Sequence, residues 1–142
     1  MTEPTKPSVP DVVKRTVVAW GENAHTDLSD ARILLGSGSC RNVAFLAQQC
    51  AEKSLKGVLI LHQREYPYTH NIAEILTHIV EIDHSLADTC STASKLIAYA
   101  VRTRYARVQT VTFENAKEAL SIAGDVYARA KAYVAAFGVI WP

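Results

Sequence analysis

The chain has 142 residues, of which 49% are hydrophobic, so it is long enough to bury the core of one ordinary domain. Fifteen Lys and Arg residues against fourteen Asp and Glu give a formal charge of +1, which excludes a strong overall attraction to nucleic acid or anionic membranes. No apolar run approaches the roughly 20 residues that cross a bilayer. We therefore expect a soluble, cytoplasmic protein in which any phosphate contact is local.

The cysteines indicate the same compartment. Cys40, Cys50 and Cys90 are an odd number, they lack CxxC or Cys/His ligand spacing, and the sequence shows no signal peptide. These features are typical of free thiols in a reducing cytoplasm. We predict no metal site and no cofactor.

Residues 1–10 carry prolines at positions 4, 7 and 10, which is typical of an extended, disordered lead-in. Residues 11–142 form a single domain in this interpretation. Apolar residues in this part recur at steps of three and four, and almost never at steps of two. We therefore predict an all-α fold, an antiparallel up-and-down bundle of four to five helices.

The first helix is expected over about 12–35, ending at Gly36, and the second over about 41–62. Pro67 then predicts a loop, after which Asn71 can cap the third helix. The fourth helix is expected from about Ser85 to position 105. The last helix begins after Thr112.

The second helix has two stripes at 100° per residue. The first consists mainly of small residues that let a neighbouring helix approach closely: Val43, Ala47, Cys50, Ser54, Gly57 and Leu61. The second mixes apolar and polar residues: Phe45, Gln49, Glu52, Lys56 and Leu59. Because both sides carry apolar positions, we expect this helix to be central.

The polar residues of the second stripe are expected to be partly buried, and buried charges need partners. Glu52 and Lys56 stand four apart, in the favourable order for an ion pair that contributes about 0.3–0.5 kcal/mol when exposed. Arg104 interrupts the apolar stripe predicted for the fourth helix in the same way. We predict a polar seam in which Arg104 bridges to Glu52; solvated helix edges are the alternative interpretation.

Four segments carry a resemblance to a known family. They are DLSDARILL at 27–35, AFLAQQCAEKSLKGVL at 44–59, YTHNIAEIL at 68–76 and LIAYAVRTRY at 96–105. In this order the chain resembles the HEPN domain (higher eukaryotes and prokaryotes nucleotide-binding). The resemblance implies a helical bundle that is commonly a homodimer, that is often encoded beside a minimal nucleotidyltransferase, and that is proposed to bind nucleotides or to serve that partner.

Some relatives are RNases or toxins that use an Arg and a later His with four to six residues between them. No His follows Arg104 in this sequence, so the usual general base is missing there. Arg64 and His70 have five residues between them but straddle the predicted loop. We therefore expect a non-catalytic protein. An RNA-cleaving toxin using Arg64, His70 or Arg104 is the alternative, and a structural dimerisation module is the second alternative.

The stretch RTRYAR, at positions 102–107, is the densest positive cluster. Guanidinium groups match phosphate oxygens, and a tyrosine ring can stack on a base. We predict a nucleotide or phosphate site whose members are Gln49, Lys53, Lys56, Arg102, Arg104 and Tyr105. The C-terminal sequence VIWP would expose Trp141, which indicates a dimer interface unless the tail folds back on its own bundle.

Overall fold

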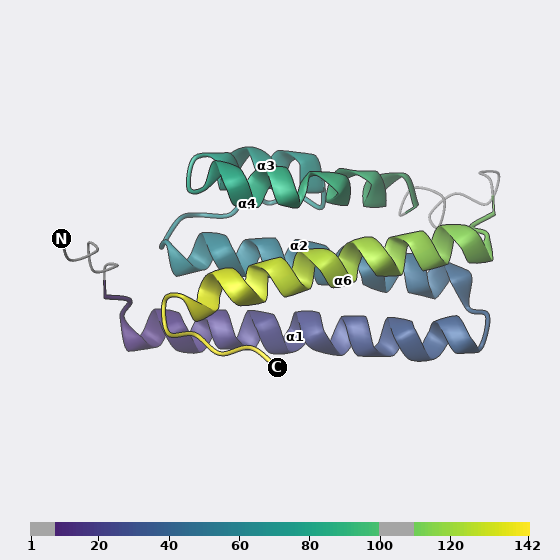
Figure 1. Ribbon diagram of the computed structural model, residues 1–142, viewed down its shortest axis with the longest axis horizontal. Coiled ribbons are helices and arrows are strands. Elements are labelled where there is room, and N and C mark those ends of the chain that lie inside the picture. Colours follow the sequence, from purple (N-terminus) through teal and green to yellow (C-terminus); the bar gives the residue numbers. More distant parts are fainter. Residues whose placement is uncertain (1–7, 100–109) are drawn as a thin grey trace.

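The computed structural model describes residues 8–99 and 110–142, and this part of the chain contains helices and no strands. The helices are α1 (Asp11–Gly36), α2 (Cys40–Leu61), α3 (Ile72–Val80), α4 (His84–Thr89), the 3₁₀ helix η1 (Ser91–Lys95) and α6 (Phe113–Ala135). Figure 1 shows that α1 and α2 run in opposite directions, that the α3, α4 and η1 segment forms a third layer, and that α6 returns parallel to α2. The predicted all-α up-and-down bundle is confirmed.

α2 is the central helix, as predicted, because it packs against α1, α3 and α6. All six members of its small-residue stripe are buried. Within that stripe, burial raises the pKa of the Cys50 thiol to about 12, so this cysteine stays a protonated, unreactive core residue. Cys40 and Cys90 are free thiols as well.

The chain turns tightly between α1 and α2. The backbone N–H groups of Gly38 and Ser39 donate to the carbonyl groups of Leu35 and Leu34 at the end of α1. Gly38 has a φ of +78°, in the left-handed region that glycine enters without steric cost. This short connection makes α1 and α2 antiparallel neighbours.

Side chains cap three of the helices. Asn71 accepts from an α3 amide, as predicted, and Thr112 forms a capping box at the start of α6, where the last helix was expected to begin. Asp83 caps α4 by accepting from the Leu86 amide at 2.9 Å, so the helix begins at His84, one residue before the expected start near Ser85. An ionised carboxylate satisfies an unpaired helix amide more strongly than a hydroxyl does.

The prediction of one continuous fourth helix is wrong. α4 ends at Thr89, and η1 follows with 3.0 residues per turn instead of 3.6. Across η1 and the residues on either side of it, buried residues recur every third position: Cys90, Ala93, Leu96 and Tyr99. The Thr89 and Ser94 hydroxyls donate to carbonyl groups three residues back, which is compatible with the tighter turn.

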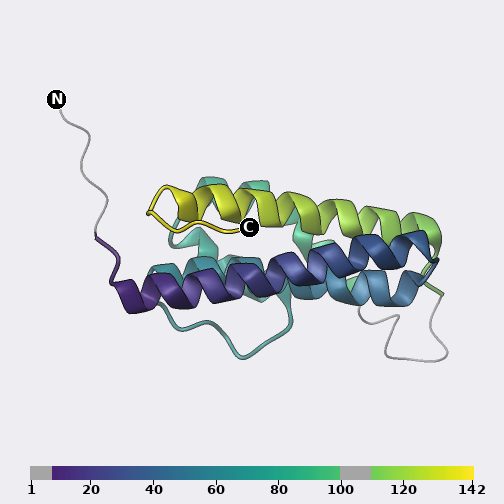
Figure 2. The same cartoon turned by 90° about the horizontal axis from the view of Figure 1, so that it is seen from below.

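The C-terminal tail folds back over its own bundle (Figure 2), which corrects the prediction of an exposed interface segment. After Gly138, whose φ is +82°, the tail buries Val139 and Trp141. The Trp141 indole donates to the Val17 carbonyl at 2.9 Å and stacks on Tyr127, with ring centroids 5.7 Å apart. Apolar burial and a satisfied indole N–H together explain why the tail packs inward.

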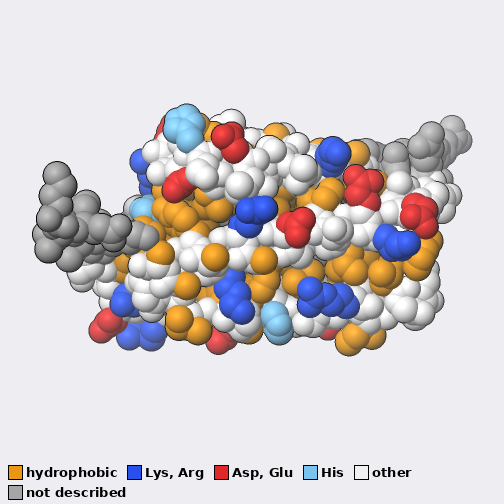
Figure 3. Space-filling model, in the orientation of Figure 1, with side chains coloured by type: hydrophobic (Ala, Val, Ile, Leu, Met, Phe, Trp, Pro, Cys, Tyr) orange, Lys and Arg blue, Asp and Glu red, His pale blue; other side chains and the backbone are white. Residues whose placement is uncertain are grey.

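The described helices include none that could cross a membrane. Figure 3 shows Lys and Arg side chains interspersed with Asp and Glu on one face of the molecule. This mixture agrees with the formal charge of +1. A ligand site on this protein must therefore rely on individual side chains at the site, and not on a broad electrostatic potential of one sign.

Candidate functional site

Residues 62–71, which we call the docking loop, connect α2 to α3 and lie alongside the bundle (Figure 2). The loop begins with Gln63 in the left-handed region, at a φ of +55°. It ends at Asn71, whose backbone N–H donates to the Thr69 hydroxyl at 3.0 Å. Between these points the loop is fastened to α2 by polar side chains.

Gln48, Glu52 and Lys56 form a ladder on α2 that faces the docking loop, and all three are buried. The Lys56 ammonium donates to Glu52 Oε1 at 2.7 Å and to the Thr69 carbonyl at 3.2 Å. The His70 ring nitrogen Nδ1 lies 3.1 Å from Glu52 Oε1 and 3.2 Å from Oε2. Gln48 Nε2 donates to the His70 carbonyl at 3.0 Å. Three side chains of one helix thus hold two consecutive loop residues.

Gln48 is only 1% exposed, yet its Oε1 accepts no hydrogen bond from the residues that the structure describes. A buried carbonyl oxygen without a donor costs about 1–3 kcal/mol, so such atoms are uncommon in native proteins. The ladder therefore contains one buried acceptor for which residues 8–99 and 110–142 supply no donor.

Aromatic rings line the outer side of the docking loop. Tyr66 meets Trp20 of α1 edge to face, with centroids 5.5 Å apart, and the Lys56 ammonium lies 5.1 Å from the Tyr66 ring centroid. Trp20, Asn23 and Lys53 line a pocket of about 270 Å³ between α1 and α2. An aromatic ring, an amide and an ammonium group therefore line the same pocket.

Two further rings of the docking loop face solvent. Tyr68 is fully exposed, and the His70 side chain is 65% exposed although Nδ1 is held by Glu52. A carboxylate on one ring nitrogen fixes the orientation of an imidazole and leaves the other nitrogen for a second contact. The loop thus presents aromatic faces on a backbone that the ladder holds in place.

The structure brings some predicted site residues together. Glu52 and Lys56 form the predicted ion pair. Lys53 lies beside the pocket, and its ammonium pairs with Asp27 at 2.7 Å. Gln49 is half-buried next to the ladder, but its neighbour Gln48 makes the contact to the loop.

Arg64 and His70 have different partners. Arg64 pairs with Glu81 at the end of α3, at 2.7 Å on the surface, whereas His70 contacts the buried Glu52. Arg102, Arg104 and Tyr105 lie outside the described residues, and the predicted bridge from Arg104 to Glu52 lies there with them. Residues 8–99 and 110–142 contain no group of three His, Cys, Asp or Glu side chains that could hold a metal ion.

Sequence reasoning missed Gln48, Trp20 and Tyr66 as members of the site. A signal for Gln48 was present, since 48, 52 and 56 are spaced by four and form a straighter line on a helix than 49, 52 and 56. Trp20 lies on the first predicted helix, far in sequence from Tyr66. Its contact with Tyr66 depends on the path of the docking loop, which no periodic pattern encodes.

Comparison with known protein families gives a match over most of the chain, including the helices that carry this site. Neither a curated protein nor a solved structure matched the chain significantly. Residues 17–133 match the family model of the HEPN domain, a stretch that runs from α1 into α6. Because this match covers most of the chain, the protein belongs to the HEPN domain family.

Proposed function

We propose that this HEPN protein binds nucleotide bases, as free nucleotides or in single-stranded RNA, on the face formed by the docking loop and α1, and that it does not itself catalyse a reaction. The observation that carries the proposal is the set of rings that the loop presents, namely Tyr66, which contacts Trp20, and the exposed Tyr68 and His70. Exposed rings bind unstacked bases, at about 1–3 kcal/mol per base.

The rest of this face suits a nucleotide as well. Asn23 offers both a donor and an acceptor to a base edge, and the pocket that it shares with Trp20 and Lys53 is concave. Because α1 and α2 pack against each other and against α6, these groups stand on rigid elements.

Phosphate contacts need a separate source of positive charge in this proposal. The ammonium groups of Lys53 and Lys56 already pair with Asp27 and Glu52, so they contribute little net charge. We assign the phosphate contacts to Arg102 and Arg104, with Tyr105 as an additional ring. Their guanidinium groups can hold phosphate oxygens in a bidentate manner.

Calorimetric titration with ATP and with a short single-stranded RNA tests this proposal. Tyr68→Ala is expected to weaken binding about tenfold, which is the loss of one stacked base, whereas Tyr68→Phe keeps the ring and should retain most of the affinity. Tyr68 is fully exposed, so neither substitution should disturb the fold. Absence of heat with every ligand would contradict the proposal and favour a structural dimerisation module.

RNA cleavage is the second candidate function, and the contact between His70 and Glu52 favours it. A buried carboxylate on Nδ1 orients the imidazole, and the exposed second nitrogen could accept a proton from a ribose hydroxyl. We expect the wild-type protein to leave labelled RNA intact, because Arg64 is paired with Glu81 and not aimed at the same place. Cleavage that disappears in His70→Ala would establish the second candidate instead.

The family resemblance also leads us to propose a homodimer and a minimal nucleotidyltransferase as partner. The C-terminal tail does not serve this dimer, because its Trp141 is buried within one chain. Light scattering of the purified protein measures the oligomeric state. A mass of one chain at all concentrations would remove the homodimer from the proposal.

A further inference from the structure

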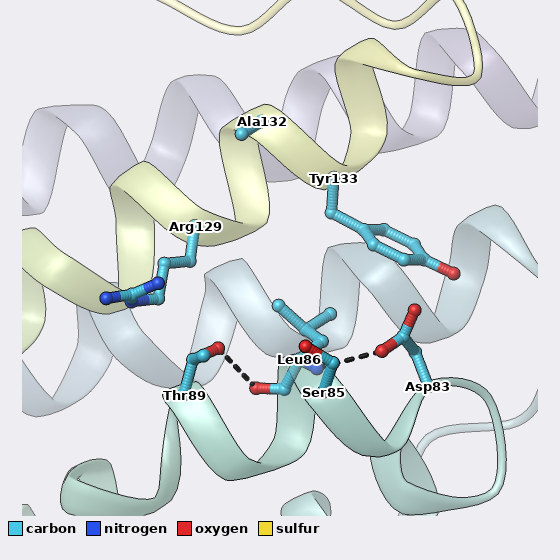
Figure 4. Close-up of a pocket in the computed structure, with 7 residues that line it drawn as sticks. All are labelled: Asp83, Ser85, Leu86, Thr89, Arg129, Ala132 and Tyr133. Carbon is cyan, nitrogen blue, oxygen red and sulfur yellow. Dashed lines mark hydrogen bonds between the residues drawn. The ribbon is translucent and has the colours of Figure 1, made fainter.

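A second pocket lies between α6 and α4, formed by residues that the proposed function does not use. It has a volume of about 360 Å³. Figure 4 shows its lining, which includes Asp83, Ser85, Leu86, Thr89, Arg129 and Tyr133. The two ends of this pocket differ in charge, and that difference indicates what it can bind.

Arg129 marks the cationic end. Its guanidinium group is exposed on α6 and forms no ion pair within residues 8–99 and 110–142. In Figure 4 the Arg129 side chain lies near Thr89, whose hydroxyl group is part of the lining. A guanidinium group at the edge of a pocket can hold phosphate or carboxylate oxygens, whereas the Thr89 hydroxyl already donates to the Leu86 carbonyl.

Asp83 and Tyr133 mark the other end, where both side chains approach each other in Figure 4. One carboxylate oxygen of Asp83 accepts from the Leu86 amide, and the second oxygen accepts from no described residue. The Tyr133 hydroxyl shares a 2.7 Å hydrogen bond with His62 Nε2. This end therefore offers oxygen atoms that suit hydroxyl donors of a ligand.

The hydrogen-bonded pair of His62 and Tyr133 keeps this end free of positive charge. Burial, together with the nearby Arg64, lowers the pKa of His62, so the ring is neutral at physiological pH. Burial also raises the pKa of Tyr133, which stays a phenol. A second phosphate group would be repelled here by the Asp83 carboxylate.

The distance between the two ends suits a small ligand. Arg129 and Tyr133 are one turn apart on α6, which corresponds to about 6 Å along the helix axis. The buried Leu86 side chain forms an apolar floor between them. A five-carbon sugar with a phosphate at one end and a diol at the other has this length and this polarity.

We propose that the pocket between α4 and α6 binds a phosphorylated sugar, with Arg129 at the phosphate and Asp83 and Tyr133 at the sugar hydroxyls. Carboxylate side chains commonly hold ribose hydroxyls in this way in nucleotide-binding proteins. The inference does not rest on base binding at the docking loop, because the two pockets share no lining residue and only His62, at the start of the loop, contacts Tyr133.

An NMR titration with ribose 5-phosphate tests the inference, since this ligand has no base to stack on the docking loop. We expect shifts centred on residues 83–89 and 129–133, and an affinity at least tenfold higher than that for inorganic phosphate or ribose alone. Arg129→Gln and Asp83→Asn should each weaken binding about tenfold. Asn is as good a helix cap as Asp, so Asp83→Asn should leave α4 folded.

Two variants serve as controls. Arg32→Gln removes another exposed arginine, from the groove between α1 and α6, and Tyr68→Ala removes a ring of the docking loop. Neither should change the affinity for ribose 5-phosphate. A parallel titration with AMP identifies the source of the sugar phosphate, since tighter binding of AMP at residues 83–89 points to nucleotides. Shifts elsewhere, or an unchanged affinity in Arg129→Gln, would overturn the proposal.

Discussion

Replacing Trp141 with alanine is expected to lower the free energy of unfolding by about 3–5 kcal/mol, the usual cost of removing a large buried aromatic side chain. The indole is 2% exposed and fills the space above two glycines. A Cβ atom at Gly21 would lie 2.3 Å from Trp141 Cδ2, and one at Gly57 would lie 2.9 Å from Cζ2. Urea denaturation followed by circular dichroism measures the loss.

Ile140→Ala is the matched control, because Ile140 is adjacent in the tail but 73% exposed. Its unfolding free energy should stay within about 0.5 kcal/mol of the wild type. Gly21→Ala should also destabilise the protein, because its added methyl group would force the Trp141 indole out of its place. Equal stabilities of the Trp141 and Ile140 variants would show that the tail does not pack as described.

Replacing Glu52 with glutamine is expected to have the second large effect. The substitution keeps the shape of the side chain but leaves the Lys56 ammonium buried without its counter-charge. Breaking a buried ion pair from one side costs about 3–5 kcal/mol, because the remaining charge is not solvated. The docking loop should detach at His70, so the affinity for nucleotides should fall together with the stability.

A surface ion pair provides the comparison for this result. Glu81→Gln removes the partner of Arg64, and both side chains of that pair are well exposed. Its effect on the unfolding free energy should not exceed about 1 kcal/mol. The double variant Glu52→Gln with Lys56→Met should recover part of the lost stability, since it removes the unpaired charge. A single Glu52→Gln variant as stable as Glu81→Gln would contradict the buried ladder.

The helices of this protein could largely be predicted from its sequence. The period of the apolar residues and the residues that start and end helices determine most of them. Apolar steps of three and four gave α1, α2 and α6 nearly to their ends, and Asn71 and Thr112 marked two helix starts. The break after Thr89 could not be predicted in the same way. Serine and threonine occur in both α and 3₁₀ turns, and the choice between them depends on which residues the bundle buries.

The candidate site was predictable only where it lies within one helix. Glu52 and Lys56 are four apart on α2, so their ion pair follows from helix geometry. The contacts of His70 and Tyr66 depend on how an irregular loop returns to the bundle, which involves α1 as well as α2. Trp141 shows the same limit, because a tail beyond a helix end carries no periodic signal of where it packs.

The central claim is that the docking loop and α1 form a base-binding face. An NMR titration of isotope-labelled protein with ATP, repeated with a single-stranded RNA, tests it most directly. The account predicts that backbone amide signals shift around Trp20 and Asn23, around Lys53, and along residues 66–70, with smaller changes in Tyr68→Ala. Spectra that do not change, or changes confined to other surfaces, would contradict it.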